Sequence, residues 1–119
     1  MLSEINSFRQ IYIKCGRTDL RKGIDGLASL VYEEFGMNPF QEDVLFLFCE
    51  TRQDRFKGLV WEGTGFVLLY KRIEAGHVKW PKDTDDLASI STDDFRKLLS
   101  GMTILERGSV HSISCTKIV

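Results

Sequence analysis

Apolar side chains recur at steps of three and four along residues 24–35, which predicts an amphipathic helix. Gly36 follows at the position typical of a C-cap glycine, and Pro39 prevents the helix from resuming. We therefore expect one main helix that buries its apolar face against the rest of the protein. The residues on that face are Ile24, Leu27, Ala28, Val31 and Phe35.

Several β-prone runs surround this helix. Residues 44–49 are apolar at both alternating sets of positions, which predicts a strand covered on both faces and therefore a central one. A Gly-Thr-Gly turn at 63–65 joins two further runs as a tight hairpin. Together the runs predict an antiparallel meander. Besides 44–49, the predicted strands are 11–13, 56–62, 66–73 and 77–80.

The chain becomes polar after Pro81. Residues 82–86 predict a linker, and Ser91 can then cap a short helix, with Asp94 reaching back from the third helical position. The tail at 109–119 is equally compatible with an added edge strand and a disordered end. The predicted fold class is α+β: an antiparallel β-meander of about five strands, one main helix packed on it, and a short C-terminal helix. That last helix would bury Phe95, Leu98 and Leu99 and close at Gly101.

Composition agrees with a single domain over residues 1–119, with its core at about 11–101. The chain has 119 residues, of which 43% are hydrophobic and 28% charged, and its formal net charge is −1. This balance excludes nucleic-acid binding over the whole surface and a polybasic membrane anchor. No apolar run is long enough for a signal peptide core or a membrane span. We expect a cytoplasmic protein.

The cysteines and histidines indicate neither a metal site nor a cofactor. Cys15, Cys49 and Cys115 are widely spaced and form no C-x-x-C pair, which fits a reducing compartment. His77 and His111 are isolated from one another. Cys49 lies inside an apolar run, so we expect a core residue and not a reactive thiol.

Charge is uneven along the chain. Residues 52–82 carry seven basic and three acidic side chains, a local balance of +4, and residues 14–22 add +3. Residues 83–94 carry five aspartates and no base, a balance of −5. The small net charge therefore hides a basic and an acidic region, and we expect a two-faced molecule.

Lys71 and Arg72 are consecutive in a predicted strand, so one of them must point toward the helix-covered face. Arginines beside Tyr70 and Trp80 would suit phosphate contacts combined with base or sugar stacking. The alternative is a solvated sheet face on which basic side chains lie over aromatic rings. In that case the cations would pair with Asp19, Asp25, Asp54, Glu62 and Glu74.

The turn before the main helix is a second basic cluster. Thr18 or Asp19 can cap the helix, and Arg21 and Lys22 then lie near its N-terminus, where cations oppose the helix dipole. These two side chains are expected either to hold an anionic partner or to pair with a neighbouring carboxylate such as Asp25.

Signals for an enzyme are weak. A metal-dependent nuclease needs clustered carboxylates beside a lysine, and Asp54, Lys57 and Glu62 do not have that spacing. The glycine turns at 16–19 and 63–65 lack the Lys-Ser/Thr ending of a phosphate-binding loop. We expect no catalytic residues; a nuclease using Asp54 and Glu62 is the one enzymatic hypothesis that remains.

Four segments carry a resemblance to a known family. They are residues 18–27 (TDLRKGIDGL), the motif Arg52-x-Asp54-Arg55-x-Lys57, residues 65–76 (GFVLLYKRIEAG) and Trp80-Pro81. In order, spacing and residue type they resemble the small TnpB accessory proteins of the insertion-sequence-66 family of bacterial transposable elements. These proteins are distinct from the RNA-guided nucleases that share the TnpB label. The resemblance covers about residues 11–101.

The resemblance implies a small non-enzymatic helper, encoded beside a separate DDE-type transposase, that assists movement of the element. It brings no settled biochemical activity; nucleic-acid binding or contact with the transposase is the usual conjecture. The family is more basic where this chain has Glu50, Gln53, Ala75 and His77. The basic positions that match are Arg21, Lys22, Arg52, Arg55, Lys57, Lys71 and Arg72, and they coincide with the clusters found from charge.

We therefore expect these seven residues to contact phosphates of element DNA or of a transposase-bound complex, with Trp80 as a stacking or packing surface. The alternative is a protein-interaction module. In that reading the meander edge, or the acidic segment 83–94, docks on a basic transposase or on a second copy of the chain. Neither hypothesis involves a small-molecule substrate or a membrane.

Overall fold

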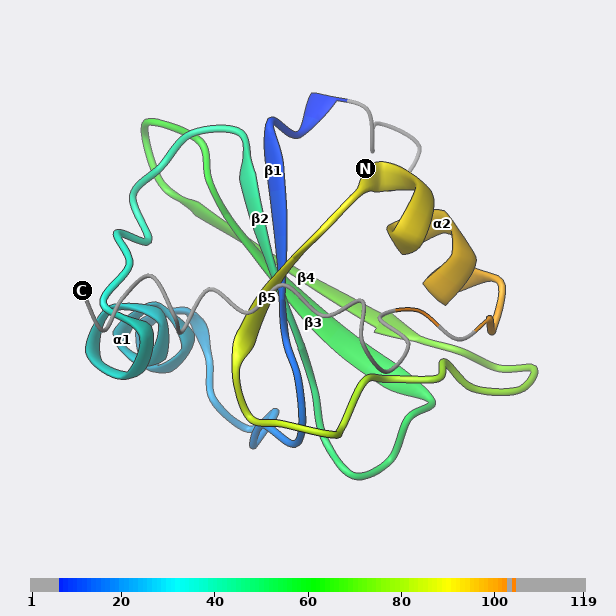
Figure 1. Ribbon diagram of the computed structural model, residues 1–119. Coiled ribbons are helices and arrows are strands. Elements are labelled where there is room, and N and C mark those ends of the chain that lie inside the picture. Colours follow the sequence, from blue (N-terminus) through cyan, green and yellow to red (C-terminus); the bar gives the residue numbers. More distant parts are fainter. Residues whose placement is uncertain (1–6, 103, 105–119) are drawn as a thin grey trace.

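The structure is a computed structural model that describes residues 7–102 and residue 104. It contains one five-stranded sheet in the order β4-β3-β2-β1-β5, together with two helices (Figure 1). The α+β class is therefore confirmed, while the tail at 109–119 lies outside the described residues. The elements are β1 (Gln10–Lys14), α1 (Ile24–Phe35), β2 (Val44–Cys49), β3 (Arg55–Trp61), β4 (Phe66–Arg72), β5 (Leu87–Ile90) and α2 (Thr92–Leu99).

The sheet is mixed, so the prediction of a purely antiparallel meander is wrong. β1 runs parallel to β2, whereas the pairs β1–β5, β2–β3 and β3–β4 are antiparallel. The cause is α1, which follows β1 and carries the chain back along one face of the sheet before β2 begins. Parallel neighbours need such a crossover of about a dozen residues or more, usually a helix. The β3–β4 hairpin was predicted and is confirmed.

β2 is the central strand that its apolar run predicted, and all six of its residues are buried. Leu45 and Leu47 belong to the core cluster that contains Phe95 of α2. Phe46 and Phe48 belong to the cluster that contains the apolar face of α1. The two helices therefore lie on opposite faces of the sheet, as Figure 1 shows.

Residues 77–80 form no strand, contrary to the prediction. Val78 and Trp80 are buried, and their backbone N–H groups donate to the backbone and side-chain oxygens of Gln53. Residues 77–80 therefore alternate between exposed and buried positions without forming a strand. They belong to an irregular segment that packs into the core beside the β2–β3 loop. The fifth strand is instead β5, which pairs antiparallel with β1.

The C-terminus of α1 and the N-terminus of α2 agree with the sequence signals. Gly36 follows α1 with φ of 63°, a left-handed conformation that glycine adopts without steric cost. At the start of α2, the Ser91 hydroxyl accepts the Asp94 N–H at 3.0 Å, and the Asp94 carboxylate accepts the Ser91 N–H at 3.3 Å. This reciprocal pair is the predicted capping box.

Candidate nucleic-acid interface

The β3–β4 hairpin sets the geometry of the basic side chains. In its register Arg55 lies opposite Arg72, and Lys57 lies opposite Tyr70. Residues two apart in a strand share a face, so these four side chains lie on the same side of the sheet as Leu59, which packs in the α1 cluster. The hairpin therefore gathers three cations around one aromatic ring on the α1 side of the sheet.

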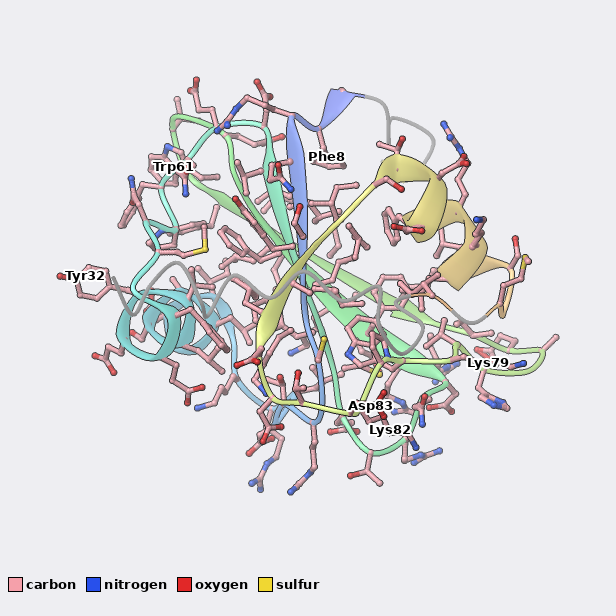
Figure 2. The ribbon with its side chains drawn as sticks, in the orientation of Figure 1. Phe8, Tyr32, Trp61, Lys79, Lys82 and Asp83 are labelled. Carbon is pink, nitrogen blue, oxygen red and sulfur yellow. The ribbon has the colours of Figure 1, made fainter. Side chains whose placement is uncertain are left out.

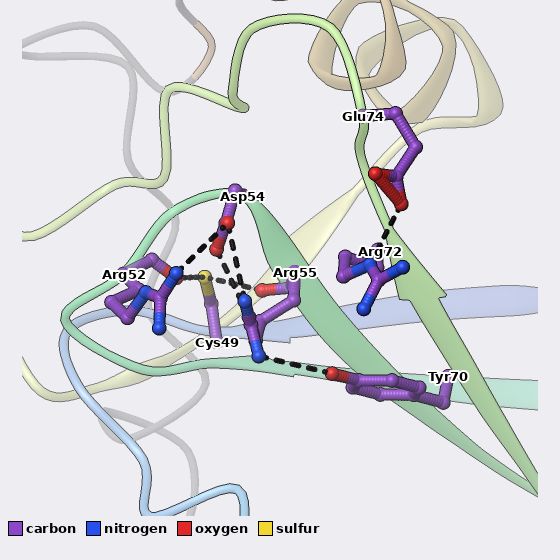
Figure 3. Close-up of polar contacts among 7 residues, drawn as sticks. All are labelled: Cys49, Arg52, Asp54, Arg55, Tyr70, Arg72 and Glu74. Carbon is purple, nitrogen blue, oxygen red and sulfur yellow. Dashed lines mark hydrogen bonds and ion pairs between the residues drawn. The ribbon is translucent and has the colours of Figure 1, made fainter.

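Asp54 holds two of the arginines at the start of β3 (Figure 3). Its carboxylate accepts two hydrogen bonds from the Arg55 guanidinium, at 3.0 and 3.2 Å, and lies 3.6 Å from the Arg52 guanidinium. The hydrogen bonds from Arg55 lower the pKa of Asp54 and raise the pKa of Arg55. Asp54 thus remains ionised and orients Arg55, whose guanidinium also donates to the Tyr70 hydroxyl at 3.4 Å.

Arg72 and Arg21 have carboxylate partners two residues away in the chain. Arg72 donates to Glu74 at 2.7 Å, and Arg21 donates to Asp19 at 2.9 Å. The hydrogen bonds from Arg21 lower the pKa of Asp19 to about 2. Both guanidinium groups remain exposed, at 59% for Arg72 and 89% for Arg21. The carboxylate partner of Arg21 is therefore Asp19 and not the suggested Asp25.

The turn before α1 is built differently from the prediction. The N-cap residue is Gly23, and no side chain caps the helix, so neither Thr18 nor Asp19 has that role. Thr18 is buried, and its hydroxyl has no hydrogen-bond partner. Lys57 instead stabilises the turn: its ammonium donates to the carbonyls of Leu20 and Lys22. The same ammonium lies 6.0 Å from the centre of the Tyr70 ring.

These side chains surround a hollow of about 450 Å³ between the turn and the hairpin. Arg21, Arg55 and Lys57 line it, so three of the predicted cations converge although they come from separate parts of the chain. The remaining lining residues are Leu20, Glu50, Leu68 and Tyr70. We call this group of seven residues the Tyr70 hollow.

Five of the eight predicted residues do not line the Tyr70 hollow. Arg72 lies opposite Arg55, Arg52 lies at Asp54, and the Lys22 side chain lies against Gly26 of α1.

Lys71 and Trp80 lie away from the hollow. Lys71 is opposite Phe56, which belongs to the α2-side core, so Lys71 lies on the other face of the sheet from Arg72. Trp80 is buried at 4% exposure, packs near Phe56, and donates its indole N–H to the Lys14 carbonyl at 2.9 Å. Its ring is not presented to a nucleic-acid base, so of the two roles expected for it, a stacking or a packing surface, the structure shows packing in the core.

Of the two aromatic residues that the sequence analysis placed beside the arginines, Tyr70 is the exposed one. Its side chain is 54% exposed on β4, whereas Trp80 sits in the core. The sequence contains a signal for the position of Tyr70 among the basic residues. The short turn at 63–65 sets the register of the hairpin, and that register places Tyr70 opposite Lys57. What the sequence did not reveal is that the 77–80 segment turns inward and that Leu20 and Glu50 close the hollow from other loops.

The acidic segment does not form one surface. Asp93 and Asp94 lie in the first turn of α2, where carboxylates favour the helix dipole and, for Asp94, complete the cap. Asp83 and Asp85 are exposed in the loop before β5, and the Asp85 carboxylate lies 4.0 Å from the Lys14 ammonium. Figure 2 shows Asp83 beside Lys82 in this loop.

Cys49 borders the site as a structural thiol. Its S–H donates to the Arg55 carbonyl at 3.1 Å (Figure 3), and burial raises its pKa to about 12. Burial likewise raises the pKa of Cys15 to about 11. Because the thiolate is the reactive form, the raised pKa keeps both thiols protonated and unreactive at pH 8.

We expect Cys15 and Cys49 to resist iodoacetamide at pH 8 in the folded protein and to react fully after denaturation. Peptide mass spectrometry of the two samples measures this directly. Labelling of Cys49 in the folded state at the rate of a free thiol would contradict the burial that the structure assigns to it.

Residues 7–102 and 104 support neither a metal site nor a membrane-spanning helix. No cluster of three or more His, Cys, Asp or Glu side chains in this part of the chain could hold a metal ion. Neither α1 nor α2 has the length and apolar character needed to cross a membrane.

Comparison with known proteins assigns this chain to a family. The sequence model of the family described as "IS66 Orf2 like protein" matches residues 9–108, which includes every residue of the Tyr70 hollow. The chain belongs to the IS66 Orf2-like family. The resemblance found in the sequence motifs is thereby confirmed. IS66 is an insertion sequence, so this IS66 Orf2-like protein is associated with transposition.

Two curated relatives come from Sinorhizobium fredii (strain NBRC 101917 / NGR234). The "Uncharacterized protein y4jC" is 30% identical over 93 residues, which cover 78% of this chain and 79% of the relative. The "Uncharacterized protein y4hO" is 33% identical over 94 residues, which cover 78% of this chain and 80% of the relative. No solved structure matches this IS66 Orf2-like chain.

Proposed function

We propose that this IS66 Orf2-like protein is a non-enzymatic accessory factor that contacts phosphates of element DNA through the basic face around Tyr70. The observation that carries the proposal is the convergence of Arg21, Arg55 and Lys57 on one hollow, with Arg72 opposite Arg55 on the same sheet face. Phosphate contacts by clustered arginines position a protein on nucleic acid and supply much of its affinity.

Four of the seven cations pair with carboxylates that the alternative of a solvated sheet face named: Arg21 with Asp19, Arg52 and Arg55 with Asp54, and Arg72 with Glu74. The pairs of Arg21 and Arg72 are compatible with phosphate binding, because exposed ion pairs contribute only about 0–1 kcal/mol and a phosphate can share or replace them at small cost. A guanidinium carries five N–H donors, and the ion pair of Arg72 with Glu74 occupies its Nε–H. The pairs of Arg21 and Arg72 therefore hold the side chains in place and leave donors directed to solvent.

The test is a binding titration of the full chain with terminal-repeat DNA at several salt concentrations. We expect the logarithm of the affinity to fall linearly with the logarithm of salt, with a slope of about 0.9 for each phosphate contact on duplex DNA. The absence of association at low salt, or an affinity that salt does not change, would contradict direct DNA contact.

A second candidate function is docking on a basic transposase through the loop before β5. It is favoured by the exposed carboxylate of Asp85, which is 89% accessible although it lies 4.0 Å from the Lys14 ammonium. This candidate requires the two proteins to co-purify after nuclease treatment, and to separate when Asp83 and Asp85 are changed to Asn. A complex that nuclease dissolves would instead favour bridging by DNA.

A further inference from the structure

We propose that the Tyr70 hollow receives one unpaired base of a nucleic-acid strand, while the arginines at its rim hold the adjoining phosphates. The inference rests on the proposed DNA contact and specifies its ligand: a single-stranded or looped-out nucleotide and not a continuous duplex.

The ring of Tyr70 is presented as a stacking surface. Tyr70 is 54% exposed although it lies within a strand, and β4 is an edge strand of the sheet. Arg55 donates to its hydroxyl at 3.4 Å, and the Lys57 ammonium lies 6.0 Å from the ring centre. These contacts restrict the ring on one side and leave more than half of the side chain open to a partner. Base stacking on such rings is tolerant of sequence because every base has a π-face.

The lining of the hollow is mixed. Leu20 and Leu68 supply apolar surface beside the Tyr70 ring, and Glu50 and Lys57 add one side chain of each charge. Arg21 and Arg55 also line the hollow, and Arg72 lies on the same face beside Arg55. The hollow therefore offers an aromatic ring and apolar surface to a base, with cations beside them for the strand's phosphates.

The size of the hollow agrees with one nucleotide. Its volume of about 450 Å³ falls within the range of about 300–1,000 Å³ that is typical of small-molecule sites. A base in a continuous duplex is stacked on both faces, so it reaches a site of this kind only after leaving the stack. Unpaired nucleotides in hairpin loops and single strands meet that condition without the cost of unstacking.

The experiment compares labelled oligonucleotides bound to the full chain: a terminal-repeat duplex, the same sequence with an unpaired loop, and the loop as RNA. We expect the looped DNA to bind more tightly than the duplex. Tyr70→Leu, which keeps an apolar side chain but removes the π-face, should weaken loop binding roughly 5- to 150-fold, the range measured for loss of one stacked base. Tyr70→Phe should bind the loop as the wild type does.

Tyr32→Ala is the matched control. Tyr32 is 66% exposed on α1 and points away from the sheet (Figure 2), so its loss removes an exposed tyrosine outside the Tyr70 hollow. Loop binding by this variant should equal that of the wild type. Circular dichroism of every variant verifies that the fold is retained.

Photocrosslinking with iododeoxyuridine at the unpaired position gives a second readout that does not depend on affinity. We expect the crosslinked peptide to contain Tyr70. If Tyr70→Leu binds the loop with wild-type affinity and the crosslink lies outside Tyr70, the proposed base site is wrong. Salt-dependent DNA binding, and with it the proposed function, would be unaffected by that result. Failure of all three oligonucleotides to bind would instead overturn the proposed function. Tighter binding of the RNA loop would support the base site and assign its ligand to a transcript.

Discussion

Changing Arg21, Arg52 and Arg72 together to Gln will lower the salt slope of terminal-repeat DNA binding by about 2.7, because each lost phosphate contact removes roughly 0.9. These arginines are the ones whose side chains are most exposed near the hollow, at 89%, 68% and 59%. Their pairing is with local carboxylates on the surface, so the substitutions should leave the fold and its core unchanged.

A triple variant elsewhere provides the control for net charge. Arg9, Arg96 and Lys97 are exposed, and changing them to Gln removes the same total charge. Arg9 precedes β1 at the opposite end of the sheet from Arg55, and Arg96 and Lys97 lie on α2 across the sheet. We expect this variant to keep the wild-type salt slope. Equal losses in the two triple variants would mean that binding follows total charge and not the basic face.

Trp80→Ala will lower the free energy of unfolding by about 3–5 kcal/mol, the usual cost of removing a large buried aromatic side chain. Trp80 is 4% exposed and lies with its ring 6.1 Å from that of Phe56 in the α2-side core. The substitution leaves a cavity and also removes the indole N–H that the Lys14 carbonyl accepts. Denaturant unfolding followed by circular dichroism measures the change.

Trp80→Phe separates the two contributions, since it keeps an aromatic ring and loses the N–H group. We expect it to be destabilised by less than Trp80→Ala. Tyr32→Ala, at an exposed position, should stay within about 0.5 kcal/mol of the wild type. A near-neutral Trp80→Ala would contradict a core position and would favour the stacking role over the packing role among the two that the sequence suggested.

The basic face could be predicted in part. The charge pattern and the family motifs identified Arg21, Arg55, Lys57 and Arg72, which the structure places on or beside one hollow. The same evidence included Lys71, because residue type alone does not say which of two consecutive strand residues lies on which face. The face follows from the register, in which Lys71 lies opposite a buried phenylalanine.

The aromatic partner could not be chosen correctly from the pattern alone. Tyr70 directly precedes Lys71 and Arg72, and Trp80 directly follows Lys79, so both aromatic residues have basic neighbours in the chain. Trp80 is buried, whereas Tyr70 is exposed, because the backbone carbonyl and the side chain of Gln53 hold the 77–80 segment against the core. A contact between segments so far apart in the chain leaves no local periodicity to detect.

The sequence by itself determined the elements whose signals are local: α1 and its glycine cap, the capping box of α2, the buried central strand and the β3–β4 hairpin. Each depends on spacing or turn chemistry within a few residues, and each agrees with the structure. Only the tertiary structure decided that β1 and β2 are parallel, that β5 closes the sheet, and that the cations meet at Tyr70. These features arise from the packing of distant segments, whose free energy depends on complementary surfaces that exist only once the sheet and both helices have assembled.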